Sequence, residues 1–153
     1  MKPLISLVLP IFNEEGNIGE LYDRSKKTLE SLGSHEIIFI NDGSRDRTLE
    51  KILKIADKDK NVKIIDFSRN FGHQTAITAG MDNSQGEAVV IMDGDLQDTP
   101  ETIPELVKKW KEGYEVVYAK RRTRKDSLFK RATAYAFYRI IKKIANIDIT
   151  EDT

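Results

Sequence analysis

The sequence predicts an α/β fold in which a mostly parallel sheet carries helices on both of its faces. Short apolar segments alternate with longer amphipathic segments along most of the chain. The short segments are rich in β-branched residues and nearly continuous in apolar character, as parallel strands covered on both faces require. The strand-helix-strand order implies right-handed crossover connections within a single sheet.

Five strands and four helices are expected in the first 118 residues. The apolar segments predict strands over residues 5–9, 37–40, 62–65, 88–92 and 115–118. Helical periodicity predicts helices over approximately residues 15–31, 47–57, 75–83 and 100–112. Thr99 followed by Pro100 is typical of a helix start, because a hydroxyl can cap the helix and proline suits its first position. Residues 127–145 are expected to form one more helix.

The composition restricts the class of protein. The chain has 153 residues, of which 39% are hydrophobic and 33% charged, as in a soluble globular domain. It contains no cysteine, which rules out disulfides and favours a reducing, cytoplasmic setting. The apolar run at residues 4–9 is too short for a signal peptide or a membrane span. Motifs of P-loop nucleotidases, dinucleotide-binding proteins and serine hydrolases are missing.

The zero net charge conceals two regions of opposite sign. Residues 1–119 carry 15 basic and 21 acidic side chains, whereas residues 120–153 carry 10 basic and 4 acidic ones. The basic segment indicates an anionic partner such as phosphate, a membrane surface or nucleic acid. In the expected helix 127–145, Arg131, Arg139, Lys142 and Lys143 share one face. That helix fits docking on an anionic lipid surface, or packing on the sheet with its basic side in water.

Polar and mostly acidic turns follow four successive expected strands. They are Pro10–Glu14, Asn41–Ser44, Asp66–Asn70 and Asp93–Asp95. Carboxyl ends of parallel strands meet at one sheet edge, where ligands bind, and carboxylates gathered there repel each other without a cation. Oxygen ligands of this kind suit Mg²⁺ or Mn²⁺.

Placement distinguishes one Asp-x-Asp motif from another. Asp93-Gly94-Asp95 follows an expected buried strand, and Gly94 permits a tight turn and a close ligand approach. Asp57-Lys58-Asp59 ends a helical pattern in a lysine-rich stretch, and we interpret it as solvated. His35 is interpreted as structural, while His73, at an expected helix start, fits either a phosphate-side role or an ordinary surface role.

Four sequence blocks begin at Val8, Asn41, Ser68 and Asp93 and read VLPIFNEE, NDGSRDRT, SRNFG and DGDLQDTPE. They resemble family 2 glycosyltransferases, and most of all their polyprenyl-phosphate branch, which includes dolichol-phosphate mannose synthases and bactoprenol glucosyltransferases. The resemblance covers residues 4–145. It implies a GT-A fold, with a Rossmann-like, mostly parallel sheet, and a nucleotide-sugar donor. The SRNFG and DLQD blocks favour a UDP-sugar.

The resemblance also implies roles for individual residues. Asp95 and Gln97 would bind the Mg²⁺ or Mn²⁺ that bridges the diphosphate, and Asp95 and Arg121, an arginine directed toward the phosphates, would be the catalytic residues. Lys130 and Arg131 would hold the acceptor phosphate. The nucleotide would be bound by Pro10, Phe12, Asn13, Glu14, Asp42, Arg69 and Asp93.

A single GT-A catalytic domain over residues 1–153 is expected, with the nucleotide-sugar and metal part in 1–119 and the basic loop and amphipathic helix in 120–153. Because relatives usually continue past this point, the domain is expected to be truncated at its C-terminus and to transfer sugar poorly or not at all. The implied reaction is metal-dependent, inverting transfer to a polyprenyl phosphate at the cytoplasmic face of the membrane, without nucleic acid; the oligomeric state stays open.

Three other functions are compatible with parts of the sequence. A family 2 transferase acting on a saccharide or protein acceptor would use the same donor site. A nucleotidyltransferase uses a similar sheet and acidic metal site, but normally shows a glycine-rich loop where Pro10–Glu14 stands. A non-enzymatic module that binds anionic lipid or nucleic acid would use the basic segment and leave the acidic turns unexplained.

Overall fold

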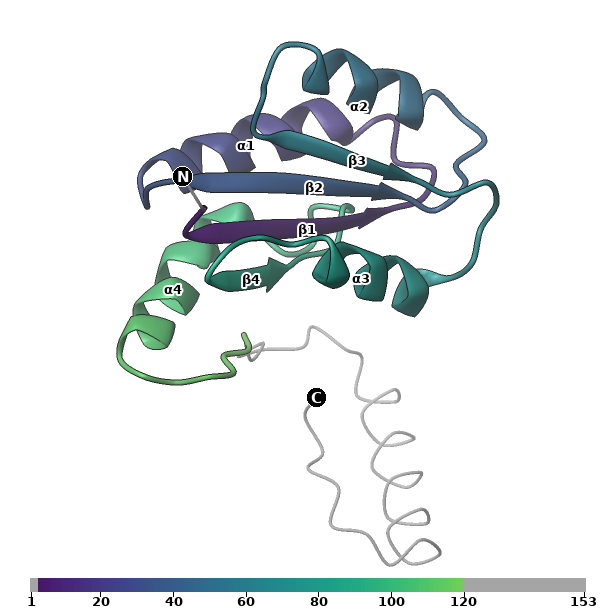
Figure 1. The fold of residues 1–153 in the computed structure, drawn as a ribbon. Coiled ribbons are helices and arrows are strands. Elements are labelled where there is room, and N and C mark those ends of the chain that lie inside the picture. Colours follow the sequence, from purple (N-terminus) through teal and green to yellow (C-terminus); the bar gives the residue numbers. More distant parts are fainter. Residues whose placement is uncertain (1–2, 120–153) are drawn as a thin grey trace, which may run out of the picture. The chain divides into compact units, whose positions relative to one another are not determined.

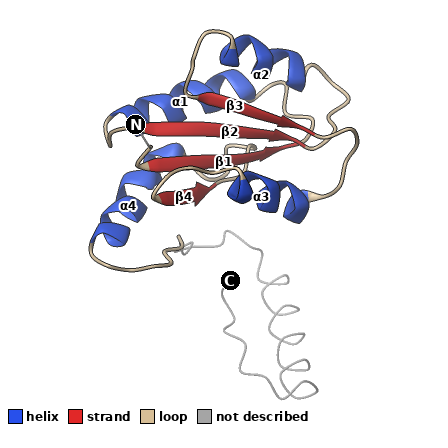
Figure 2. Ribbon diagram, in the orientation of Figure 1, coloured by secondary structure: helices blue, strands red, loops and turns tan. Residues whose placement is uncertain are grey.

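The computed structural model describes residues 3–119 as a parallel four-stranded sheet with helices on both faces (Figures 1 and 2). The strands lie in the order β3-β2-β1-β4. Residues 3–116 belong to one compact unit. The strands are β1 (Ile5–Ile11), β2 (His35–Asn41), β3 (Val62–Asp66) and β4 (Ala88–Ile91). The helices are α1 (Ile18–Glu30), α2 (Thr48–Ala56), α3 (His73–Asp82), the 3₁₀ turn η1 (Pro100–Thr102) and α4 (Ile103–Lys111).

Alternate residues of the central strands supply two separate cores. Leu7, Leu9 and Phe39 belong to the larger core, which α1, α2 and α4 cover. Val8 and Ile38 point to the opposite face and pack against α3. This division follows from the two-residue period of a strand, and it explains why both phases of β1 and β2 are apolar.

The first four expected strands and all four expected helices are confirmed, with shifts at their ends. The first helix begins only at Ile18, because the preceding residues form a loop at the end of β1. Pro100 does start a helical turn, but the Thr99 hydroxyl makes no capping hydrogen bond. Instead, the Thr102 hydroxyl donates to the Thr99 carbonyl at 2.8 Å.

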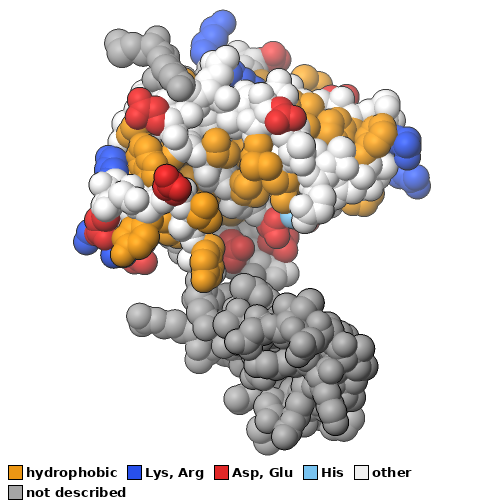
Figure 3. Space-filling view, turned by 60° about the horizontal axis from the view of Figure 1, so that its bottom comes forward, with side chains coloured by type: hydrophobic (Ala, Val, Ile, Leu, Met, Phe, Trp, Pro, Cys, Tyr) orange, Lys and Arg blue, Asp and Glu red, His pale blue; other side chains and the backbone are white. Residues whose placement is uncertain are grey.

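The expected fifth strand at residues 115–118 is wrong. These residues form no strand, and the Val116 side chain is 83% exposed. Among the described strands, β4 pairs with β1 alone and is the edge of the sheet. A strand requires a paired neighbour, so an apolar run without one stays irregular. Val89 and Ile91 of β4 are also exposed, and hydrophobic side chains gather on this side of the molecule (Figure 3).

The expected helix at residues 127–145 and the basic loop before it lie outside the described residues. Within residues 3–119, none of the helices combines the length and the apolar character needed to cross a bilayer.

The interpretation of Asp57-Lys58-Asp59 as solvated is wrong for one of its carboxylates. Asp57 is exposed, but Asp59 is only 8% exposed and bonds back to α1. Its Oδ2 accepts hydrogen bonds from the Tyr22 hydroxyl at 2.7 Å and from the Lys26 ammonium at 2.9 Å. Burial works to raise the pKa of Asp59, but these two partners outweigh it and lower that pKa to about 2. Asp59 therefore fastens the end of α2 to α1.

We expect the Asp59 contribution to stability to disappear in acid. Because the folded pKa of about 2 lies below the ordinary 3.8, the ionised carboxylate stabilises the fold above that ordinary value, and the stabilisation is lost as the pH falls toward 2. Asp59→Asn should lower the free energy of unfolding by about 1–2 kcal/mol near neutral pH and by almost nothing near pH ~2. Urea titrations at several pH values measure this difference. Asp57→Asn is the matched control, and an equal loss in both variants would contradict the assignment.

A second buried carboxylate holds the turn that leads into β4. Glu36 accepts hydrogen bonds from the Ser6 hydroxyl and the Gln85 backbone N–H, and its Oε2 lies 2.6 Å from the Lys63 ammonium. The Gly86 N–H in turn donates to the Ser6 hydroxyl at 2.8 Å. Burial works to raise the pKa of Glu36, but Lys63, Ser6 and Gln85 outweigh it and lower the pKa. By the two-residue period of a strand, Ser6 and Glu36 lie on the same face of the sheet as Val8 and Ile38.

Glu36→Ala is expected to destabilise the protein by about 2–3 kcal/mol, because it leaves buried donors without an acceptor. The Lys63 side chain is partly exposed and can regain water, which keeps the loss below that of a fully buried pair. Glu50→Ala removes an exposed carboxylate paired with Lys54 and should cost no more than about 0.5 kcal/mol. Chemical unfolding of both variants checks this, and similar losses would argue against a buried network.

Candidate functional site

The loops after the four strands gather at the carboxyl edge of the sheet, and the first two are joined by hydrogen bonds from backbone N–H groups to side-chain oxygens. The Asn13 N–H donates to the Ser44 hydroxyl at 2.9 Å, and the Arg45 N–H donates to the Asn13 side-chain oxygen at 2.8 Å. Asn13 has a φ of 55°, a left-handed conformation that asparagine tolerates better than most residues. Asn13 therefore holds the turn that carries Phe12 and Glu14.

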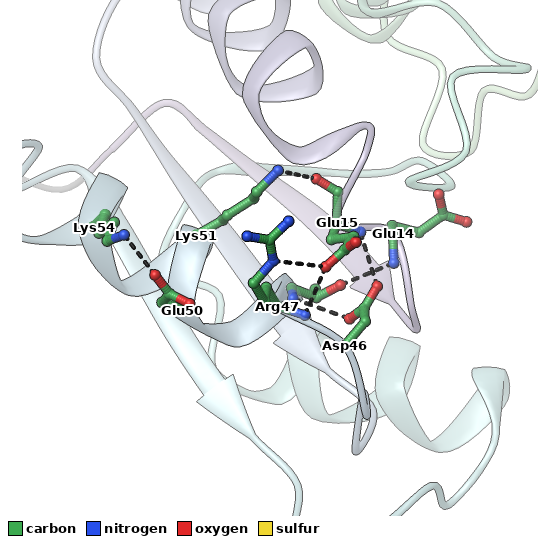
Figure 4. Close-up of polar contacts among 8 residues, drawn as sticks. Glu14, Glu15, Asp46, Arg47, Glu50, Lys51 and Lys54 are labelled. Atoms are coloured by element: carbon green, nitrogen blue, oxygen red, sulfur yellow. Dashed lines mark hydrogen bonds and ion pairs between the residues drawn. The ribbon is translucent and has the colours of Figure 1, made fainter.

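A second set of contacts joins these loops to α2 (Figure 4). The Thr48 hydroxyl accepts from the Glu14 N–H at 2.9 Å, and the Asp46 carboxylate accepts from the N–H groups of Glu15 and Thr48. Burial works to raise the pKa of Asp46, but the hydrogen bonds from Thr48 and Glu15 outweigh it and lower the pKa. The Glu15 carboxylate accepts from the Arg47 N–H at 2.9 Å.

Glu14 takes part in these contacts through its backbone N–H only. Its carboxylate points away from the other labelled residues and accepts from the Asn17 amide at 2.6 Å. Sequence reasoning missed the supporting roles of Glu15, Asp46 and Thr48. A signal was present, because an Asp two residues before Thr48, at the start of an expected helix, is typical of a side chain that accepts from the backbone.

Asp42 fastens the loop after β2 to the loop after β3. Its side chain is 4% exposed, and its two oxygens accept from the backbone N–H groups of Phe71 and Gly72, at 2.7 and 3.0 Å. Gly43, with a φ of 68°, allows the same close approach, since a Cβ there would lie 2.3 Å from the Arg69 carbonyl carbon. The expected contact of Asp42 with the nucleoside stays a prediction, and the structure gives this carboxylate a positioning role.

A cleft of about 430 Å³ opens between the loops after β1, β2 and β3. Of the predicted site residues, Phe12 and Arg69 line it. The Arg69 guanidinium lies over the Phe71 ring, 4.2 Å from its centre, in a cation–π contact. The complete lining is Phe12, Asn41, Gly43, Ser44, Arg45, Leu49, Asp66, Phe67, Ser68, Arg69 and Asn70. Pro10 is buried within β1 and does not line the cleft.

The acidic turn Asp93-Gly94-Asp95 follows β4 and presents two exposed carboxylates. Gly94 is buried, and a Cβ there would lie 2.2 Å from Ile11 Cδ1, so a larger residue would require the Ile11 side chain to move. The Gln97 N–H donates to Asp95 Oδ1 at 2.9 Å, which folds the turn back on itself.

His73 connects this turn with the loop that Asp42 holds. Its Nε2 lies 3.5 Å from Asp93 Oδ1, and the residue begins α3 directly after Gly72. A continuous path of contacts therefore leads from Asp42 through Gly72 and His73 to Asp93. The two readings of His73, a phosphate-side role or a surface role, both stay predictions, but its contact partner is now the acidic turn.

The turn fits a hard divalent cation. Asp95 and Gln97 supply carboxylate and amide oxygens from one exposed turn. These two residues do not form a complete metal site, since residues 3–119 contain no group of three His, Cys, Asp or Glu side chains able to hold a metal. Mg²⁺ and Mn²⁺ are commonly held by one or two carboxylates together with water and substrate phosphates, so a complete protein cage is not required. The predicted residues Arg121, Lys130 and Arg131 lie outside the described residues.

Comparison with known proteins agrees with this arrangement. The family described as glycosyl transferase family 2 matches residues 6–152. The chain is 53% identical over 150 residues to the uncharacterized glycosyltransferase YkcC of Bacillus subtilis, covering 97% of this chain and 46% of that protein. It is 45% identical over 151 residues to a prophage bactoprenol glucosyl transferase homolog of Escherichia coli, covering 97% of this chain and 49% of that one. The chain thus spans about half the length of these curated relatives.

Solved structures share the fold. The glucosyl-3-phosphoglycerate synthase of Mycobacterium tuberculosis, in complex with Mn²⁺, UDP and glucosyl-3-phosphoglycerate, superposes with a TM-score of 0.61 at 23% identity, over 98% of this chain and 55% of that one. This similarity confirms the expected GT-A fold. With the family match over nearly its whole length, the chain belongs to glycosyl transferase family 2.

Proposed function

We propose that this chain forms the donor-binding part of a glycosyltransferase that moves a sugar from a UDP-sugar to a polyprenyl phosphate. The observation that carries the proposal is the cleft at the carboxyl edge of the sheet, connected by Asp42, Gly72 and His73 to an exposed acidic turn. In open α/β sheets this edge is where ligands bind. The names of the bactoprenol glucosyl transferase relatives support the acceptor class.

The nucleoside would occupy the cleft. Phe12 and Phe67 offer aromatic surface to a base, and Arg45 and Arg69 offer positive charge at the rim. The hydrogen bonds of Asn13, Asp42 and Asp46 keep these loops in place before the ligand arrives, which reduces the entropy lost on binding.

The diphosphate would extend toward the acidic turn, where Asp95 and Gln97 would hold a divalent cation. Such a cation neutralises the charge that develops on a leaving nucleoside diphosphate. The Mn²⁺ in the complex of the mycobacterial relative supports a divalent metal, with Mg²⁺ as the alternative ion. Asp93 would contact the nucleoside, and the His73 contact would keep its carboxylate in that orientation.

The acceptor would bind through the basic segment. A polyprenyl phosphate is already ionised and needs little help from a general base. We expect a direct in-line displacement, which inverts the anomeric carbon. Arg121 would face the donor phosphates, and Lys130 and Arg131 would bind the acceptor phosphate, at the cytoplasmic face of the membrane.

The metal role of Asp95 leads to a calorimetric prediction. Mn²⁺ should strengthen UDP binding at least ~10-fold, because a cation held by Asp95 would neutralise charge on the diphosphate. Asp95→Asn should remove most of that enhancement and leave the weaker metal-free binding in place. UDP should also bind more tightly than GDP.

Asp57→Asn is the matched control, since it alters an exposed aspartate of the other Asp-x-Asp motif and should bind UDP like the natural protein. Failure of the folded protein to bind either nucleotide would refute the proposal. Equal metal enhancement in Asp95→Asn and the natural protein would refute the assignment of the metal to this turn.

A further inference from the structure

We propose that Arg24 and Glu101 are positioning residues for the divalent cation, although both lie outside the acidic turn. Their ion pair anchors the segment that follows the turn to α1, and so holds Asp95 and Gln97 in the arrangement that a cation requires. The inference rests on the proposed function, since it concerns the cation site proposed there.

The Arg24 guanidinium, in α1, donates two parallel hydrogen bonds to the Glu101 carboxylate, in η1. Its Nε lies 2.9 Å from Oε1 and its Nη2 lies 2.7 Å from Oε2. Isolated ion pairs at a surface contribute little, but a bidentate pair of arginine and carboxylate fixes the distance and the orientation of both partners. The hydrogen bonds from Arg24 also lower the pKa of Glu101 to about 2, so the carboxylate stays ionised near neutral pH.

This pair acts on the acidic turn because η1 is the next element after it. Residues 96–99 connect the turn to η1, and Pro100, the first residue of η1, is buried. At the other end, Gly94 packs against Ile11 of β1. The turn and its connection are therefore held on both sides, by β1 before them and by the Glu101 contact with α1 after them.

The backbone between the two proposed ligands needs such support. Leu96 lies between them and has a φ of 61°, a left-handed conformation that is uncommon for leucine. Conformations of this kind persist only where the surrounding structure determines them. The Leu96 side chain packs against the larger core, and the Gln97 N–H donates to Asp95 Oδ1 at 2.9 Å. The positions of Asp95 and Gln97 thus depend on anchors outside the turn, and Glu101 supplies the one on the η1 side.

The same pair closes the series of contacts that joins the four loops. Hydrogen bonds of Asn13 and Asp42 connect the first three loops, and His73 connects the third to the fourth. Since α1 continues the first loop and η1 continues the fourth, the ion pair of Arg24 with Glu101 joins the fourth loop back to the first. A site that is supported on all sides loses less freedom when the ligand binds.

The test measures the affinity for UDP by calorimetry, with and without Mn²⁺, in the natural protein and in Glu101→Gln. Glu101 is exposed, so the substitution leaves the core intact, and it removes one of the two acceptor oxygens that face Arg24. We expect the enhancement of UDP binding by Mn²⁺ to fall about 5-fold, because residues that support metal ligands contribute to metal affinity. The affinity for UDP without metal should stay within about 2-fold, since the nucleoside cleft is unchanged.

Arg24→Gln should have the same effect as Glu101→Gln. The double variant should lose no more than either single variant, because the two side chains act as one pair.

Glu20→Gln is the matched control. It removes the other carboxylate that Arg24 contacts, at 2.9 Å, and leaves the pair with Glu101 in place, so it should retain the full enhancement by Mn²⁺. The inference would be overturned by an unchanged enhancement in Glu101→Gln, by an equal loss in Glu20→Gln, by additive losses in the double variant, or by equal weakening with and without Mn²⁺. Failure of the natural protein to bind UDP, or to bind it more tightly with Mn²⁺, would instead refute the proposed function and its metal site.

Discussion

The hydrogen bonds that the Asp42 carboxylate accepts from Phe71 and Gly72 hold together the loops after β2 and β3, on which the rest of the site depends. Each is a charge-assisted bond in a buried setting, of a kind that contributes about 1.5–3 kcal/mol when formed. Since Gly72 directly precedes α3, the same two hydrogen bonds fix where that helix begins. His73, its first residue, then contacts Asp93 in the acidic turn.

The site therefore consists of rigid strand ends and loops that support one another. Asn13 joins the first loop to the second, Asp42 joins the second to the third, and His73 joins the third to the fourth. Each of these contacts involves a residue, Asn13, Asp42 or Asp93, that the family resemblance also places at the donor nucleotide. The polar side chains in this region divide into a supporting set with satisfied hydrogen bonds and a ligand-facing set, in which Asp66 and Asp95 remain exposed.

Much of this arrangement could be predicted from the sequence, because parallel strands have a strong local signature. The apolar runs of β1 to β4 and the polar turns after them predict that Asp42 and Asp93 lie at one sheet edge. The sequence pattern could not predict which segments and side chains find a partner in the folded protein. Residues 115–118 have the composition of a strand but no partner among the described strands, and Asp59 lies in a lysine-rich stretch but is buried against Tyr22.

The division of labour among the carboxylates was also beyond sequence reasoning. Asp42 and Asp66 both follow strands and look equivalent in sequence, and only the paths of the loops decide which one is enclosed. The resemblance to family 2 glycosyltransferases assigned Asp42 to the nucleoside by position. Its observed hydrogen bonds add a supporting role that depends on Gly43, whose missing side chain lets the two loops meet.

The most direct measurement of the central claim, that these four loops form one donor site, is a crystal structure of the protein with UDP and Mn²⁺, with the metal located by its anomalous scattering. The account predicts that the metal is bound by Asp95 and the diphosphate, with the uracil in the cleft beside Phe12 and Asp66. A metal bound away from the acidic turn, or a base bound outside the cleft, would contradict it.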